Sequence, residues 1–342
     1  MPVLDTQALI DERVAAIRRA HAQSGISRAE LDVSGGVDSA TLLGLLARAL
    51  GPERVTAVYS SIQSSKESHE RAREVAEAFA VPLIELELSP AFDAILAECR
   101  RAMEAAGYDL AQIDARCQRD ATVVGSIRSC IRAPIGRGLN RMTGGGLRHG
   151  TGNECEDRWL RFFQKGGDGE VDSNPIAMLS KGEVYQLARA LGVPRSIIDA
   201  TPSPDLQGRG EDHNDEDELR EASGGVAWTY SRVDFESGRY TKFGTIERLS
   251  RLLDLDHEGL LFGDLDPFED EARRARLLES SELTFVGFDE SERLGFLQSA
   301  RRWEAITRHK MNPNCPSYGT RAALMAAGIL SNEIPEGLEK GR

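Results

Sequence analysis

The sequence predicts an α/β fold: a Rossmann-like parallel sheet with helices on both faces, followed by a helical C-terminal extension. Three observations lead to this prediction. Short apolar strands alternate with helical segments, a glycine pair directly follows the first strand, and the last part of the chain shows mostly helical spacing. The alternation requires crossover connections, which are right-handed and make neighbouring strands parallel.

The spacing of apolar residues and the helix-stop signals place the individual elements. We expect a leading helix over 5–25, a strand over 31–33, a helix over 40–50, a strand over 55–60, a helix over 66–80 and a strand over 82–86. Further helices are expected over 92–106, 121–140 and 181–191. Pro134 should kink or break the second of these three, because proline removes a helix hydrogen bond.

The second half of the chain contains two stretches of different character. Residues 205–240 are polar and rich in glycine and acidic residues, which predicts a mobile segment. Residues 245–328 are mostly amphipathic helix. We therefore expect an α/β domain over 1–237 and a mostly helical extension over 238–342, packed on the same domain.

Composition places the chain among folded proteins and excludes several functional classes. Its 342 residues are 40% hydrophobic and 28% charged, enough to bury a core without disulfides. There is neither a long apolar run nor a basic leader, which predicts a cytoplasmic protein without membrane contact. The net charge of −13 argues against a nucleic-acid partner. The five cysteines form no CxxC pair, which predicts reduced thiols.

The clearest chemical signal is the hexapeptide SGGVDS at residues 34–39, between a strand and a helix. Gly35 and Gly36 let successive N–H groups point at one place, which makes an anion site, and the two serines add hydroxyls. Asp38 would repel an anion unless a cation lay between them, and Mg²⁺ fits that role. A glycine-rich turn whose Asp serves the helix N-terminus is the alternative.

Other polar residues near glycines and helix starts are candidates for the same site. Glu156 could reach the Mg²⁺ of Asp38, or be a surface residue at a helix start. Thr151 and Ser203 offer hydroxyls on turns, with local capping as the alternative.

Two lysines and two aspartates belong to the same group of candidates. Lys165 and Lys181 are cations beside glycines or at a helix start, which favours an anionic ligand over simple solvation. Asp168 and Asp172 flank a glycine, where they could fix a loop or bind a ribose hydroxyl.

Four more motifs follow in order along the chain. They are GTGNECED at 150–157, FFQKGGDGEVD at 162–172, LSKGEVYQLARALGVP at 179–194 and TPSPDL at 201–206. SGGVDS resembles the pyrophosphate-binding loop of N-type ATP pyrophosphatases, and the ordered set resembles the ammonia-dependent NAD synthetase family. The segments YSSIQSSKESHERA at 59–72 and DEDEL at 215–219, with the His309-Lys310 pair, extend the resemblance.

This resemblance implies a ligase that uses ATP and Mg²⁺ to convert deamido-NAD and ammonia to NAD. The expected route is an acyl-adenylate, with release of AMP and pyrophosphate, in a homodimer. The implied catalytic residues are Asp38, Glu156 and Lys181, of which Asp38 and Glu156 hold the metal. The implied ATP-binding residues are Ser34, Gly35, Gly36, Asp38, Ser39, Thr151, Lys181 and Ser203. The implied substrate-binding residues are Arg128, Arg132, Lys165, Asp168, Asp172, His309 and Lys310.

One departure concerns the helix before GTGN. The family carries N-xx-AR-x-R there, whereas this chain has Arg128 and Arg132 four residues apart, on one helical face. We expect one of the two to replace the missing arginine. Two alternatives stay open: an amide ligase of the same mechanism that acts on another carboxylate, and a non-catalytic nucleotide-binding homologue.

Overall fold

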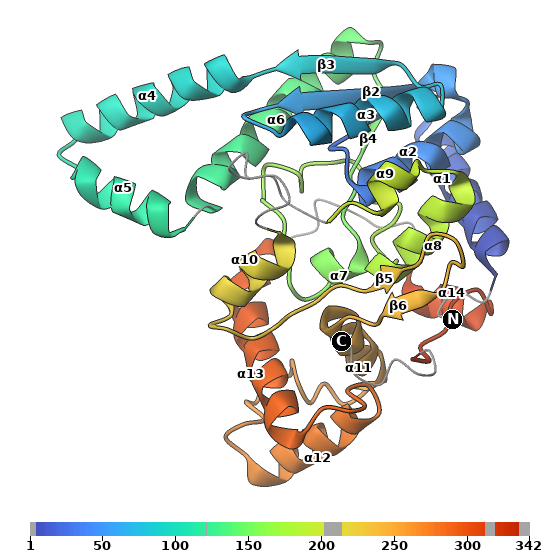
Figure 1. Ribbon diagram of the computed structural model, residues 1–342, viewed down its shortest axis with the longest axis vertical. Coiled ribbons are helices and arrows are strands. Elements are labelled where there is room, and N and C mark those ends of the chain that lie inside the picture. Colours follow the sequence, from blue (N-terminus) through green and yellow to red (C-terminus); the bar gives the residue numbers. More distant parts are fainter. Residues whose placement is uncertain (1–4, 121, 202–213, 312–318, 335–342) are drawn as a thin grey trace.

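The computed structural model describes residues 5–120, 122–201, 214–311 and 319–334. Four parallel strands form the central sheet in the order β3-β2-β1-β4 (Figure 1). The strands are β1 (Ala29–Asp32), β2 (Val55–Ser61), β3 (Leu83–Glu87) and β4 (Leu147–His149). Helices surround this sheet, and further helices follow toward the C-terminus, so the predicted fold class is confirmed.

The helices of the α/β part are α1 (Thr6–Ser24), α2 (Val37–Leu50), α3 (Lys66–Ala78), α4 (Ser89–Ala105), α5 (Leu110–Arg119), α6 (Thr122–Met142), α7 (Glu154–Asp157), α8 (Lys181–Leu191) and α9 (Arg195–Ile198), with a 3₁₀ turn η1 (Pro52–Arg54). The later elements are α10 (Asp215–Ala222), the hairpin β5 (Arg232–Val233) and β6 (Tyr240–Lys242), α11 (Thr245–Leu255), α12 (Glu271–Glu282), α13 (Glu290–Thr307), η3 (Arg308–Met311) and α14 (Arg321–Ala326). None of the described helices is both long and apolar enough to cross a bilayer.

The strand order puts β1 at the point where the connectivity reverses. From β1 the chain moves outward through β2 to β3, and it later returns to place β4 on the opposite side of β1. In open parallel sheets, ligands bind in the crevice beyond the carboxyl end of the strands at such a reversal. The SGGVDS loop begins two residues after β1 and therefore lies at this crevice.

Two expectations about local structure need correction. Pro134 does not break α6, which continues through it from Thr122 to Met142; a kink there stays a prediction. Pro134 lies on the exposed side of α6, where water can replace the missing donor. Of the stretch 205–240, which the sequence predicts to be mobile, the described residues 214–240 contain α10 and most of the β5–β6 hairpin, and residues 205–213 lie outside the described residues. The buried side chains Trp228 and Tyr230 hold this part of the chain in place.

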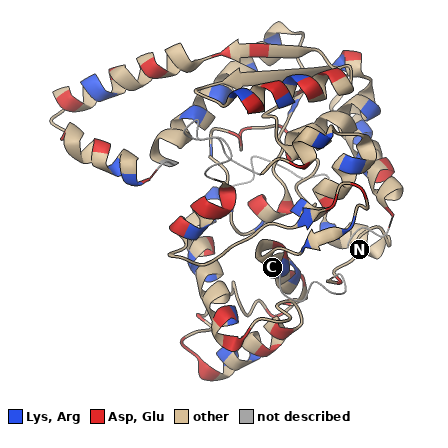
Figure 2. Cartoon of the chain, viewed as in Figure 1, with Lys and Arg blue, Asp and Glu red and all other residues tan. Residues whose placement is uncertain are grey.

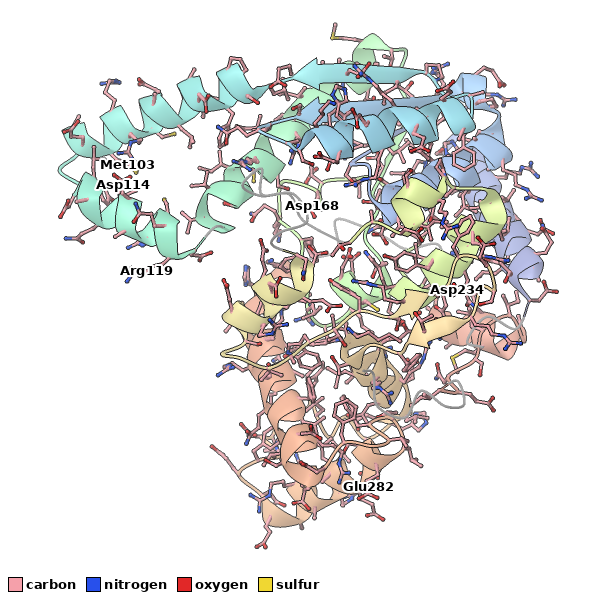
Figure 3. The ribbon with its side chains drawn as sticks, viewed as in Figure 1. Met103, Asp114, Arg119, Asp168, Asp234 and Glu282 are labelled. Carbon is pink, nitrogen blue, oxygen red and sulfur yellow. The ribbon has the colours of Figure 1, made fainter. Side chains whose placement is uncertain are left out.

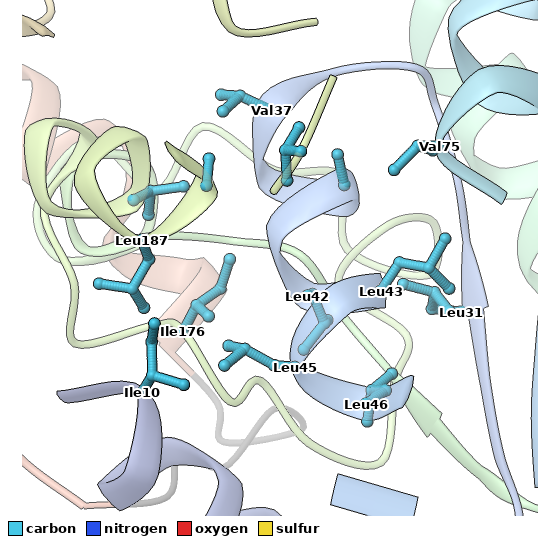
Figure 4. Close-up of a cluster of buried hydrophobic side chains, with 14 of the residues drawn as sticks. Ile10, Leu31, Val37, Leu42, Leu43, Leu45, Leu46, Val75, Ile176 and Leu187 are labelled. Atoms are coloured by element: carbon cyan, nitrogen blue, oxygen red, sulfur yellow. The ribbon is translucent and has the colours of Figure 1, made fainter. Parts of the chain in front are cut away.

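Two apolar clusters support the fold. The first joins α1, α2, the sheet and α8, and α2 is apolar on most sides because it is enclosed by the other three (Figure 4). The second is aromatic and contains Trp159, Trp228 and Phe296, with ring centroids of neighbouring pairs 4.6 and 4.9 Å apart. Its residues come from the α7 region and from α10 to α13, so the C-terminal helices pack directly on the part that carries the GTGN motif. The domain division at residue 237 stays a prediction.

A buried ion network joins α8, α11 and α14. The Glu183 carboxylate accepts hydrogen bonds from Arg321 at 2.6 and 2.7 Å and from Arg251 at 3.1 Å. Arg251 also donates to Glu247, which accepts from the Ser180 hydroxyl at 2.6 Å. All of these charges are buried, so removing one partner would leave the others buried without a counter-charge. This would lower the free energy of unfolding by about 3–5 kcal/mol. The network thereby fixes the first turn of α8.

A pair of neutral histidines connects α1 to β4. His21 Nδ1 donates to the Ile26 carbonyl at 2.7 Å, so its Nε2 accepts from His149 Nε2 at 3.1 Å. His149 Nδ1 then accepts from the Ser173 hydroxyl at 2.8 Å. A proton added to His21 would turn two Nε2–H groups toward each other, and one added to His149 would go to Nδ1 and reverse the hydrogen bond to the Ser173 hydroxyl. Burial, together with the neighbouring His21, lowers the pKa of His149 to about 3, and burial lowers the pKa of His21.

We predict that His149 makes the fold acid-sensitive. The pKa of His149 is lower in the folded chain than its ordinary value of about 6.5, so the unfolded chain binds the proton better between the two values. The contribution of His149 is complete above pH 6.5 and is lost as the pH falls toward 3, by at most about 5 kcal/mol. Urea unfolding across this range should show a shallower pH dependence for His149→Gln than for the wild type. The exposed His257→Gln is the control, and equal slopes for all three proteins would contradict the prediction.

Candidate functional site

The loop between β1 and α2 is shaped by its two glycines. Gly35 has φ +83°, and a Cβ there would lie 2.3 Å from the Ser68 carbonyl oxygen on α3, so only glycine fits. Gly36 is the N-cap of α2, in extended conformation. The Ser34 and Ser39 hydroxyls lie 3.2 Å apart inside the loop. The chain is thus turned tightly enough for the backbone of residues 34–39 to face one cavity.

The first turn of α2 leaves backbone donors available. Within the described residues, no hydrogen bond uses the N–H groups of Gly35, Val37, Asp38 or Ser39. All four residues line a cavity of about 330 Å³ at the carboxyl end of β1. Free N–H groups at a helix N-terminus attract anions, so the loop has the geometry of a phosphate site.

Lys181 lines this cavity and joins two of its carboxylates. Its Nζ donates to Asp38 Oδ2 at 2.5 Å and to Glu156 Oε1 at 2.9 Å. The Lys181 side chain is 3% exposed, against 16% for Asp38 and 18% for Glu156. Asn153, the N-cap of α7, donates to the other Asp38 oxygen at 2.9 Å. Residues from three distant motifs therefore meet at one ammonium group.

The charges of this group do not cancel. Burial opposes the charge on Lys181, but Asp38 and Glu156 overcome it and hold the pKa of Lys181 well above its usual value. Burial raises the pKa of Glu156, and Lys181 partly offsets this effect. Asp215 at the start of α10 lines the same cavity, and burial raises its pKa to about 7. One cation thus faces three carboxyl groups.

This donor set fits a hard cation in its chemistry. Asp38 and Glu156 present carboxylates to the same point, and Asp215 Oδ1 has no hydrogen-bond partner among the described residues. Mg²⁺ is commonly held by one or two carboxylates together with substrate phosphates. The described part of the chain contains no group of three or more His, Cys, Asp or Glu arranged to hold a metal by themselves.

The structure brings together most of the residues assigned to ATP. Seven of them line the cavity: Ser34, Gly35, Gly36, Asp38, Ser39, Thr151 and Lys181. Ser203 lies outside the described residues. The end of β2 and the serine-rich segment after it contribute further hydroxyls from Ser60, Ser64 and Ser65.

The two arginines of α6 have different surroundings. Arg132 lines the cavity, and its Nε donates to the Ser60 carbonyl at 3.1 Å. Arg128 is buried one turn earlier, where it donates to Gln63 and lies 5.3 Å from the centre of the Phe92 ring. Only Arg132 therefore faces the site.

The other residues assigned to the substrate are scattered around the 162–172 loop. Asp168 lies between α6 and α10 (Figure 3), lines the cavity, and accepts from the Ser129 hydroxyl at 2.7 Å and the Gln164 N–H at 2.9 Å. Asp172 pairs with Arg137 at 2.7 Å and does not line this cavity. Lys165 is exposed on the loop surface.

The two residues of the C-terminal His-Lys pair also differ in their surroundings, since only Lys310 lines a cavity. His309 is exposed, and its Nδ1 donates to the Ile306 carbonyl at 3.0 Å. Lys310 donates to the carbonyls of Arg161 and Phe163 at 2.9 and 2.6 Å. Lys310 lines a second cavity that adjoins the first.

The second cavity measures about 880 Å³ and lies between the α5–α6 region, the 161–168 loop, α10 and α13. It shares Ser129, Arg132, Phe162 and Asp168 with the first cavity. Trp303 of the C-terminal extension forms part of its wall. A ligand in the second cavity would thus reach the phosphate site directly.

Three polar residues of the site were not selected from the sequence. Asn153 and Asp215 stand inside the GTGN and DEDEL motifs, so motif position was a usable signal for both. Arg71, whose Nε donates to the Gly35 carbonyl at 3.2 Å, stands inside the 59–72 segment of the same resemblance, so motif position was a signal for it too, although it lies in a helix with many charged residues.

Comparison with known proteins is consistent across sequence and structure. The family model described as NAD synthase matches residues 9–223. The NH(3)-dependent NAD(+) synthetase of Pseudomonas aeruginosa (strain LESB58) is 33% identical over 240 residues, which cover 67% of this chain and 80% of that protein. The enzyme of the same name from Archaeoglobus fulgidus is 35% identical over 192 residues, 56% of this chain and 70% of its own.

Two solved structures share the architecture. The NAD+ synthetase from Burkholderia pseudomallei has a TM-score of 0.50 at 25% identity, over 75% of this chain and 91% of its own. The NMN synthetase from Francisella tularensis has a TM-score of 0.59 at 19% identity, over 90% of this chain and 96% of its own, a likeness that shows the fold alone. The family model spans well over half of the chain, and the Pseudomonas relative spans two thirds of it; the chain belongs to the NAD synthase family of ligases.

Proposed function

We propose that the protein is an ATP-dependent amide ligase that converts deamido-NAD and ammonia to NAD, with release of AMP and pyrophosphate. The nicotinate carboxylate attacks the α-phosphorus of ATP, pyrophosphate leaves, and ammonia displaces AMP from the acyl-adenylate. The observation that carries this proposal is the cavity in which the free N–H groups of Gly35, Val37, Asp38 and Ser39 lie beside the Lys181 ammonium and its two carboxylates.

The chain's own residues bind and orient the reactants. A carboxylate that attacks a polyphosphate is an anion approaching an anion, so the reaction needs neutralised charge and fixed geometry more than a nucleophilic side chain. The loop N–H groups and the Ser34 and Ser39 hydroxyls would bind phosphate oxygens. Lys181, held by Asp38 and Glu156, would supply a fixed positive charge close to them.

Asp38 and Glu156 would also hold Mg²⁺, as the chemistry of the donor set allows. When bound, the ion would neutralise charge on the phosphates. The resemblance to the family further supports a homodimer in the cytoplasm.

A second candidate is an amide ligase with the same mechanism and a different carboxylate. The burial of Arg128 away from the site favours it, because only one of the two helix arginines remains to bind a dinucleotide. The wall that Trp303 and Lys310 add to the second cavity comes from the extension, beyond the part of the chain that the family model matches.

We predict that purified protein given ATP, Mg²⁺, ammonium and deamido-NAD forms NAD, AMP and pyrophosphate in equal amounts. Mass spectrometry of the products measures all three. AMP formed only with another carboxylate would favour the second candidate. Hydrolysis of ATP to ADP and phosphate would contradict the assigned loop chemistry, because that chemistry requires attack at the α-phosphorus.

We expect Asp38→Asn to lower AMP formation by about 100-fold or more, through the loss of charge at the phosphate site. The variant should stay folded, because Lys181 keeps Glu156 as a partner and the introduced amide oxygen can still accept from Asn153. Circular dichroism checks the fold, and Asp11→Asn on the surface of α1 is the matched control. Near-normal turnover of Asp38→Asn would rule out a catalytic role for this carboxylate.

We expect Arg132→Leu to raise the KM for deamido-NAD about tenfold or more, because a guanidinium bonds phosphate through two parallel hydrogen bonds. Arg128→Leu, which replaces an arginine on the same helix outside the cavity, is the control and should leave this KM nearly unchanged. Steady-state kinetics with each substrate varied in turn measure the KM for deamido-NAD and for ATP in both variants. A raised KM for deamido-NAD in Arg128→Leu but not in Arg132→Leu would contradict the assignment of Arg132.

A further inference from the structure

The second cavity has an acidic wall that the proposed chemistry leaves unused. Acidic residues cluster along α10 (Figure 2), and Glu218 and Glu221 of this helix line the cavity together with Asp120. Glu218 is only 8% exposed, and its Oε2 has no hydrogen-bond partner among the described residues. A buried carboxylate oxygen without a donor is costly, so the site is suited to a ligand that brings one.

The cations of the same cavity do not fill this role. Arg161 donates to the Glu304 carbonyl and carboxylate at 3.0 and 3.1 Å, and Lys310 donates to two carbonyls. Arg132 donates to the Ser60 carbonyl. Arg119 is exposed at the end of α5 (Figure 3). The hydrogen bonds of the three inner cations thus go to other groups, and Glu218 stays available.

We propose that Glu218 binds the nitrogen nucleophile as its cation and takes a proton from it, so that the second cavity is the entry site for ammonium. The proposal rests on the proposed function. It gives the nitrogen donor a place next to the acyl-adenylate, because the second cavity opens into the phosphate site at Ser129, Arg132 and Asp168.

The step balances as a proton transfer followed by acyl transfer. Ammonium gives one proton to the Glu218 carboxylate, which frees the lone pair of ammonia. That pair forms the C–N bond to the acyl carbon as the C–O bond to AMP breaks, and the new amide loses a second proton to solvent. Glu218 then returns its proton to solvent.

The environment of Glu218 matches this role. Burial, together with the nearby carboxylates Glu221 and Asp120, raises the pKa of Glu218 to about 7. A base with a pKa near the working pH both accepts and releases a proton readily. Asp168 is the other acid that lines this cavity, and its carboxylate accepts from Ser129 and Gln164.

The test measures each step separately in Glu218→Gln. With saturating ATP and deamido-NAD, the KM for ammonium chloride should rise about tenfold or more, the range for a lost hydrogen bond to a charged group. The KM for ATP should stay unchanged. Formation of AMP and pyrophosphate before ammonium is added should also stay unchanged. Glu279→Gln, an exposed glutamate on α12 outside both cavities, should change the ammonium KM by less than threefold.

The possible results are distinguishable. An unchanged ammonium KM in Glu218→Gln would overturn the role of Glu218 while leaving the amide ligase intact, whereas a wild type that makes AMP but no amide would contradict the proposed function instead. Glu218→Asp, which keeps the charge, should recover part of the ammonium KM; if it behaves like Gln, the effect is structural and the proposal fails. Methylamine and ethylamine are tested beside ammonium, and a Glu218-dependent KM for any of them supports the site and identifies the nucleophile.

Discussion

The ammonium group of Lys181 is the contact on which the site depends. It joins Asp38 at the start of α2 to Glu156 in α7, and Lys181 itself begins α8. The strands that precede α2 and α7 are paired in the sheet. The Glu154 N–H donates to the Leu179 carbonyl at 2.8 Å just before α8, so the backbone brings the three side chains within reach of one another. A cation at a helix N-terminus is opposed by the helix dipole. The two carboxylates offset that opposition, and they explain why a lysine is tolerated at this position.

The position of Lys181 depends in turn on buried contacts at the start of α8. Ser180 caps α8 and shares a capping box with Glu183, whose carboxylate is held by Arg251 and Arg321. Arg251 lies on α11 and Arg321 on α14, so the C-terminal elements support the first turn of α8 through buried charges. The C-terminal extension is therefore part of the structural support of the site. Loss of its ion network would act first on the position of Lys181, because the network contacts the first turn of α8 and not the central sheet.

The sequence allowed the shape of the loop at residues 34–39 to be predicted because the information is local, whereas its binding of phosphate stays a prediction. A strand, two glycines and a helix start within ten residues fix where the N–H groups point, and the structure places them there. The meeting of Asp38, Glu156 and Lys181 was expected from motif resemblance, but the ammonium bridge between the two carboxylates was not. Residues 143 and 25 positions apart in sequence meet only through the tertiary fold. Arg128 and Arg132 show the limit of helical spacing: four residues apart on one face, they still meet different neighbours, Phe92 in one case and Ser60 in the other.

The net charge of −13 predicts that any anionic substrate must be met by local positive groups, and that role stays a prediction. The structure places such groups, Lys181 and the loop N–H groups, in the first cavity, and Arg132 lies where the two cavities join. Acidic residues of α10 line the second cavity, where they would attract a cation. Asp38, Glu156 and Asp215 also line the first cavity, so a phosphate there would face carboxylates and would need a cation between them. An acidic protein could thus bind both reactants in adjoining cavities only where local cations match its carboxylates, as Lys181 matches Asp38 and Glu156.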